Sequence, residues 1–159
     1  TDISDATDLY GKSKNLGEVI ESNCLTIRTS VIGREIHTRH SLVEWFLSQK
    51  GLIVKGFTNA IFSGFPTIIL ADIIADIIIN NQNMKGLYHI SSEPISKYEL
   101  LLLLKSAYKT AVEIEPFQDF VIDRSLNSTK FREETGFQPT IWSKMVEKMA
   151  ADPTPYDEW

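Results

Sequence analysis

The feature that most constrains the fold is a regular alternation of short apolar runs with longer amphipathic stretches. The runs at 24–32, 52–54, 86–92 and 111–116 are rich in β-branched and apolar residues, which is typical of strands. Between these runs, apolar side chains recur at helical spacing. An order of strand, helix and strand favours a partly parallel sheet covered by helices. The sequence therefore predicts an α/β protein.

Capping residues and glycines in the sequence predict where the helices begin and end. Ser96 stands three residues before Glu99, which predicts a capping box, and Gly51 and Gly136 are expected helix stops. The helices are expected at 11–22, 41–51, 67–80, 96–109, 127–137 and 140–151. The expected core residues include Trp45, Phe131, Trp142 and the five leucines at 100–104.

Charge and composition exclude several classes of function. The 16 basic and 21 acidic residues give a net charge of −5, which argues against nucleic acid as a partner. Cys24 is the only cysteine, so no disulfide can form within the chain, and a reducing compartment such as the cytoplasm is expected. The most apolar stretch, 61–81, is interrupted by Pro66, Asp72 and Asp76, so we expect no membrane span.

Tyr10 and Lys14 are four residues apart at the start of a helical pattern. On a helix they share one face. An ammonium group beside a phenol favours the phenolate form, which suits a tyrosine to act as a general acid or base. The alternative is that Tyr10 packs and Lys14 is solvated, because short motifs of this kind often occur without function.

The surrounding segments carry a resemblance to a known family. "YGKSKNLGEV" followed by "LTIRTSVIG" resembles the catalytic helix and the next strand of the extended short-chain dehydrogenase/reductase family. "FSGFPTIILADIIADII", "GLYHISSEPISKYELLLLL" and "DFVIDRSLNSTKFREETGFQPTIWSKMVEKM" resemble, in that order, the substrate-side half of dTDP-4-dehydrorhamnose reductases and their close relatives. The resemblance implies the C-terminal part of a Rossmann-type NAD(P)-binding fold plus a small α/β substrate-binding domain. Residues 1–35 would end the Rossmann domain, and 36–159 would mainly form the substrate-binding domain, with some segments returning to the Rossmann sheet.

The resemblance also implies an activity, namely NAD(P)H-dependent reduction of a 4-keto nucleotide sugar, as in dTDP-rhamnose biosynthesis. Tyr10 would donate a proton to the sugar carbonyl, and Lys14 would support it and hold the nicotinamide ribose. The nicotinamide site would be lined by Thr29, Ser30, Val31 and Ile32. The implied cofactor is NADP or NAD, and the implied partner is a nucleotide sugar, with a homodimer as a possible assembly.

Arg124 resembles an arginine that contacts the substrate diphosphate in the extended family. A guanidinium binds phosphate oxygens in a bidentate way. Relatives carry an Arg-Pro pair near this point, whereas this chain has Arg-Ser. The alternative is a structural ion pair with Asp119 or Asp123.

A basic loop surrounds the sequence "HTRH". Arg34 and His40 could face a nucleotide diphosphate, or the loop could simply face solvent. The two histidines, His37 and His40, have only Glu35 nearby at ligand spacing, which is too few ligands for a metal site. We therefore predict no metal.

The chain departs from the family pattern in its cofactor loop. It opens on "TDISDATD" and holds no glycine-rich turn after a strand, so we expect a fragment that covers only the C-terminal half of the family and is inactive by itself. The Ser or Thr that the family places upstream of the tyrosine would lie before residue 1. Two alternatives stay open: a nucleotide-sugar epimerase or dehydratase, which uses the same Tyr–Lys pair, or a non-catalytic nucleotide-sugar-binding or regulatory subunit.

Overall fold

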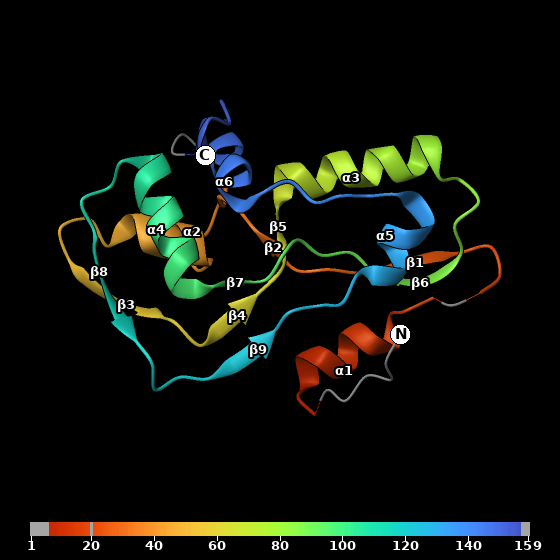
Figure 1. Cartoon of the computed structure of the whole chain (residues 1–159), viewed down its shortest axis with the longest axis horizontal. Helices are drawn as coiled ribbons and strands as arrows, with labels where there is room; N and C mark the ends of the chain where they lie inside the picture. Colours follow the sequence, from red (N-terminus) through yellow and green to blue (C-terminus); the bar gives the residue numbers. More distant parts are fainter. Residues whose placement is uncertain (1–6, 20, 157–159) are drawn as a thin grey trace.

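The computed structural model describes residues 7–19 and 21–156 and confirms the predicted α/β class (Figure 1). The helices are α1 (Leu9–Leu16), α2 (Leu42–Ser48), α3 (Thr67–Asn80), α4 (Lys97–Tyr108), α5 (Thr129–Thr135) and α6 (Trp142–Ala150). The strands are β1 (Leu25–Arg28), β2 (Val31–Ile32), β3 (Ile53–Phe57), β4 (Ala60–Phe62), β5 (Phe65–Pro66), β6 (Gly86–His89), β7 (Ile95–Ser96), β8 (Glu113–Phe117) and β9 (Ile122–Arg124).

The strands pair mostly in parallel, as the alternation with helices predicts. β1 pairs with β6, β2 with β5, and β3 with β8, each in parallel register. β4 is the centre of a three-stranded sheet, antiparallel to β7 and parallel to β9. In Figure 1, α2, α4 and α6 gather at one end of the molecule, while α3 and α5 lie at the end that holds β1 and β6.

Helix α4 anchors the core. Its predicted capping box is confirmed: the Ser96 hydroxyl accepts the Glu99 backbone N–H, and the Glu99 carboxylate accepts the Ser96 backbone N–H. Leu100, Leu101 and Leu104 are buried, but Leu102 is 41% exposed. Successive residues turn by about 100° around a helix, so five consecutive leucines cannot all face one core.

Of the three aromatic residues expected in the core, two are buried and one is not. Phe131 and Trp142 are buried, as expected, and the Trp142 indole donates a hydrogen bond to the Glu93 carbonyl at 2.7 Å. The prediction for Trp45 is wrong, because its side chain is 38% exposed. Trp45 follows the buried residues Val43 and Glu44 on α2, so it lies on the helix side that turns out of the core.

The N-terminal helix differs from the prediction. α1 begins earlier than residue 11 because Asp8 is its N-cap and accepts the Gly11 backbone N–H at 2.6 Å. It ends before Gly17, and the predicted apolar residue Ile20 lies outside the described residues. No residue of α1 is buried, and Figure 1 shows the helix set apart from the other helices.

The predicted strand at 24–32 is divided into β1 and β2, and β1 is half-buried rather than buried. Its only strand partner in the described chain is β6, so its other edge has no neighbouring strand. Helix α2 ends at Ser48, with Gln49 as its C-cap, rather than at Gly51. In the described ranges, no helix is both long and apolar enough to cross a membrane.

Candidate active site

A cavity of about 500 Å³ brings together residues from distant parts of the sequence. Its walls come from α1, from the β1–β2 segment, from the starts of α2 and α4, and from the neighbouring strands β4 and β9. Tyr10, Arg124 and the whole stretch Thr29–Ile32 line it. Six of the nine predicted site residues thus face one cavity, although the sequence separates them by more than a hundred positions.

Tyr10 reaches the cavity from α1, and 72% of the residue is exposed. The Lys14 ammonium lies over the same ring, 5.6 Å from the ring centroid, as the one-turn spacing predicts. Lys14 is not itself a lining residue. The two side chains therefore form the predicted neighbouring pair, open to whatever enters the cavity.

Side-chain contacts with β1 hold the chain that follows α1. Both guanidinium nitrogens Nε and Nη2 of Arg28 donate to the Glu18 carboxylate, at 2.6 and 2.9 Å. This bidentate pair, led by the hydrogen bond from Arg28, lowers the pKa of the Glu18 carboxyl below its ordinary value of 4.5. The Thr26 hydroxyl also donates to the Val19 carbonyl at 2.6 Å and accepts the Val19 N–H at 3.2 Å. The segment after α1 is thus tied to the strand that leads into the cavity wall.

The wall at Thr29–Ile32 is held against β5. The Phe65 backbone N–H donates to the Ser30 carbonyl at 2.9 Å. A side chain at Gly64 would meet that same carbonyl oxygen, with an ideal Cβ only 2.2 Å away, so the close approach requires glycine. The Thr29 hydroxyl oxygen is buried and has no hydrogen-bond partner in the described chain.

The far wall of the cavity is positively charged. Arg124 ends β9, and Lys97 is the first residue of α4. The lining residues include both of these cations and no carboxylate. In the part of the chain that the structure describes, neither side chain makes an ion pair, and Asp123 instead accepts the Ser125 N–H at 2.8 Å. The described structure therefore contradicts the alternative of an ion pair between Arg124 and Asp119 or Asp123.

The strand register explains why these two cations line one cavity. Phe62 of β4 pairs with Ile95 on one side and with Arg124 on the other. Three neighbouring strands span about 10 Å, and Lys97 follows Ile95 by two residues. Arg28, Arg34 and Arg132 are each paired with a glutamate. Arg124 is thus an arginine placed in a cavity without an acidic partner.

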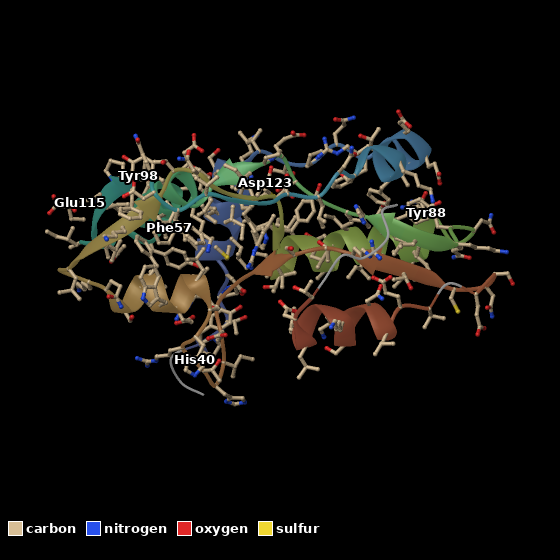
Figure 2. The ribbon with its side chains drawn as sticks, turned by 90° about the horizontal axis from the view of Figure 1, so that it is seen from below. His40, Phe57, Tyr88, Tyr98, Glu115 and Asp123 are labelled. Atoms are coloured by element: carbon tan, nitrogen blue, oxygen red, sulfur yellow. The ribbon has the colours of Figure 1, made fainter. Side chains whose placement is uncertain are left out.

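The structure does not bring Arg34 and His40 to this cavity. The Arg34 guanidinium pairs with the carboxylate of Glu44 on α2 and stacks on the Tyr156 ring, 5.0 Å from its centroid. The His40 backbone N–H donates to Glu35 at 2.7 Å, and in Figure 2 the loop that carries His40 projects away from the sheet edge marked by Asp123. Arg34 thus fastens the loop and the chain's last described residues to α2.

A second hollow of similar size lies at the other end of the molecule, beside the amide-rich loop after α3. Its one aromatic residue, Tyr88, donates a 2.5 Å hydrogen bond to the Glu134 carboxylate. That hydrogen bond and burial raise the pKa of Tyr88 to about 12, so its phenol stays protonated. None of the predicted site residues lines this hollow. In residues 7–19 and 21–156, no group of three acidic, histidine or cysteine side chains could hold a metal.

Sequence reasoning missed one cation of the cavity, Lys97, and two aromatic members, Phe62 and Phe120. Lys97 was hidden in the capping-box sequence, where a lysine after Ser96 is typical of a solvated first turn. Phe120 precedes β9, a strand that the apolar pattern did not predict. Only the alternation of Phe120, Ile122 and Arg124 along the chain carries a period-2 signal for this wall.

Comparison with known proteins shows which solved structures share this fold. No protein-family model and no curated protein sequence matches the chain. Among solved structures, dTDP-4-dehydrorhamnose reductase from Yersinia enterocolitica superposes with a TM-score of 0.73 at 20% identity, over 94% of this chain and 58% of that one. A hypothetical dTDP-4-dehydrorhamnose reductase from Sulfolobus tokodaii gives a TM-score of 0.68 at 25% identity, over 89% of this chain and 54% of that one.

A third similar structure is the dTDP-4-dehydrorhamnose reductase of Bacillus anthracis in complex with NADP, with a TM-score of 0.68 at 17% identity. The match covers 87% of this chain and 51% of that one, so the chain spans about half the length of these similar structures. The predicted resemblance to nucleotide-sugar reductases is thereby confirmed at the level of the fold. The expected fold, part of a Rossmann-type α/β architecture, is confirmed by the same comparisons.

Proposed function

We propose that the protein is the nucleotide-sugar-binding and catalytic-helix half of an NAD(P)H-dependent reductase that acts on a 4-keto nucleotide sugar. One observation carries the proposal: Tyr10, Thr29–Ile32 and Arg124 line one cavity whose cations have no acidic partner. The fold shared with dTDP-4-dehydrorhamnose reductases supports it.

In this proposal the cavity holds the substrate between its cationic wall and α1. Arg124 and Lys97 bind the diphosphate, because charge-assisted hydrogen bonds from cations to phosphate oxygens are strong. The sugar then extends toward Tyr10, whose hydroxyl donates its proton to the carbonyl oxygen as the ketone becomes an alcohol. The Lys14 ammonium beside the ring stabilises the negative charge that develops on the phenol oxygen.

The residues present fit the nicotinamide end of the cofactor. Thr29–Ile32 line the same cavity as Tyr10, and the Thr29 hydroxyl, which has no partner among the described residues, is a polar group available there. Bound NADPH or NADH supplies the hydride. The described residues contain no glycine-rich turn between a strand and a helix, so they offer no site for the cofactor's pyrophosphate. We expect the 159-residue chain by itself to bind neither NAD nor NADP.

The proposal is tested by calorimetric titration of the protein with a dTDP-sugar. Arg124→Ala should weaken binding by about 10- to 150-fold, because hydrogen bonds to charged groups contribute about 1.5–3 kcal/mol. Arg39→Ala is the matched control, since Arg39 is an exposed arginine of the loop between β2 and α2 and does not line the cavity. An unchanged dissociation constant for Arg124→Ala would remove the substrate assignment.

The cationic wall of Arg124 and Lys97 could serve binding without chemistry, so a second candidate is a non-catalytic subunit that binds a nucleotide sugar. A fluorescence titration with NADPH separates the two candidates when the protein is joined to a Rossmann cofactor domain. Binding and turnover support the reductase, whereas sugar binding without turnover supports the subunit.

Product analysis separates reduction from epimerase or dehydratase chemistry, which the same Tyr–Lys pair could serve. The homodimer and the cytoplasmic location stay predictions.

A further inference from the structure

The aromatic residue Phe120 lies just before β9, the strand that Arg124 ends. Phe120, Ile122 and Arg124 alternate along one segment, and all three line the cavity. Val121, between them, is 76% exposed and does not line the cavity. Such alternation is what an extended chain produces, since successive side chains point to opposite faces. One face of this segment therefore presents a ring, an aliphatic side chain and a guanidinium in a row.

Packing from behind holds the Phe120 ring in place. The Phe57 ring lies 5.1 Å from it at an interplanar angle of 46°, and Phe57 in turn contacts Phe117 at 5.7 Å. Phe57 and Phe117 are directly paired across the β3–β8 ladder, so the backing rings belong to the sheet. Phe120 nevertheless remains 44% exposed. An aromatic ring that is supported on one side and open to a cavity on the other is suited to stack on a flat ligand group.

The spacing fits one class of ligand. Four residues of extended chain span at most about 13–14 Å, which limits the separation between the Phe120 and Arg124 backbones. A nucleoside diphosphate has a flat aromatic base at one end and a doubly phosphorylated group at the other. The flat base could therefore stack on the Phe120 ring while the phosphates bind the Arg124 guanidinium.

We propose that Phe120 is the stacking platform for the base of the nucleotide, with the diphosphate at Arg124 and Lys97. The inference rests on the proposed function, because it takes the cavity's ligand to be a nucleotide sugar. It fixes the direction in which that ligand lies along the segment 120–124. Stacking uses the π-face that every base has, so Phe120 contributes affinity and orientation but does not distinguish thymine from uracil.

The test is calorimetric titration of the protein with thymidine diphosphate, uridine diphosphate and inorganic pyrophosphate. Phe120→Ala should weaken binding of both nucleotides by about 5- to 150-fold, the range for loss of one stacked base. Pyrophosphate affinity should not change, because pyrophosphate has no base. Arg124→Ala should weaken all three ligands.

Three further variants keep the result interpretable. Phe120→Leu retains apolar contact with Phe57 but removes the π-face, and should behave like Phe120→Ala even if the alanine variant folds poorly. Phe120→Trp should retain nucleotide affinity. Val121→Ala is the matched control from the same segment, and should bind all three ligands as the unchanged protein does.

The outcomes separate this inference from the proposed function. Nucleotide affinity that survives in both Phe120→Ala and Phe120→Leu overturns the stacking site while leaving the cavity as a diphosphate site. An equal loss for pyrophosphate and nucleotides also overturns it, since Phe120 would then act on the shape of the cavity. If the unchanged protein binds neither nucleotide nor pyrophosphate, the proposed function and this inference both fail.

Discussion

Helices α1 and α4 both reach the same cavity, yet they are held in opposite ways. α4 buries Leu100, Leu101 and Leu104 and begins with a complete capping box. α1 buries nothing, and its Leu16 is 85% exposed. The chain after α1 is held instead by the bidentate Arg28–Glu18 pair and the Thr26 hydroxyl.

The two helices therefore suit two different roles in the cavity, ligand binding and proton donation. Lys97 and Leu100 come from an element fixed by the core, which suits the binding of a charged ligand in one geometry. Tyr10 comes from an element fixed by a few polar contacts at its end, where local opening costs little free energy. The cavity therefore combines a rigid binding wall with a weakly anchored wall that carries the proposed proton donor.

The largest expected effect is on chemistry at α1. Tyr10→Phe should lower turnover by about 10²- to 10⁴-fold, the usual contribution of a general acid, while nucleotide-sugar affinity stays nearly unchanged. Steady-state kinetics in the protein joined to a Rossmann cofactor domain measures both. Tyr98→Phe is the control, because Tyr98 is a half-buried tyrosine of α4 outside the cavity lining. Turnover within about twofold of the unchanged protein would contradict the role of Tyr10.

The next effect concerns global stability. Leu104→Ala removes a fully buried side chain of α4 and should lower the free energy of unfolding by about 2–5 kcal/mol. Leu16→Ala, the same substitution on the exposed face of α1, should change it by less than about 0.5 kcal/mol. Urea unfolding followed by circular dichroism measures both. Similar losses in the two variants would mean that α1 shares the core after all.

The two helix caps give a smaller contrast. Ser96→Ala breaks the capping box of α4 and should cost about 0.5–2 kcal/mol of global stability. Asp8→Ala removes the N-cap of α1 and should leave the urea midpoint unchanged while amide hydrogen exchange within α1 becomes faster. A urea midpoint that shifts equally in both variants would show that α1 unfolds together with the core.

The smallest effect is a pH response of the α1 attachment. Since the Arg28 pair lowers the folded-state pKa of Glu18 below 4.5, the unfolded segment binds more protons there, and stability rises with pH. The contribution is complete above pH 4.5 and is lost as the pH falls through the folded-state pKa. NMR signals of Val19 and Thr26 should report this release. Glu18→Gln should abolish the step, and a step that persists in that variant would assign it to another group.

The same contrast explains what the sequence could and could not predict. α4 was predictable because Ser96, Glu99 and the leucines agree at the local level. The ends of α1 were not, because without burial its limits depend on Asp8 and Gly17 rather than on an apolar pattern. Tyr10, Lys14 and Arg124 could be proposed from resemblance to a family. Lys97 and Phe120 could not, since only the pairing of β4 with β7 and β9 brings them to the cavity.

That pairing has a consequence for how the protein folds. β4 must find β7 and then β9, which follow it by long stretches of chain, and each closure costs loop entropy before any contact repays it. The α4 nucleus, by contrast, can begin from local contacts. We therefore expect the cationic wall to mature late on the folding pathway, after most of the core has condensed. A variant in which β9 fails to pair with β4 would keep the buried leucines of α4 and lose the Arg124 wall of the ligand site.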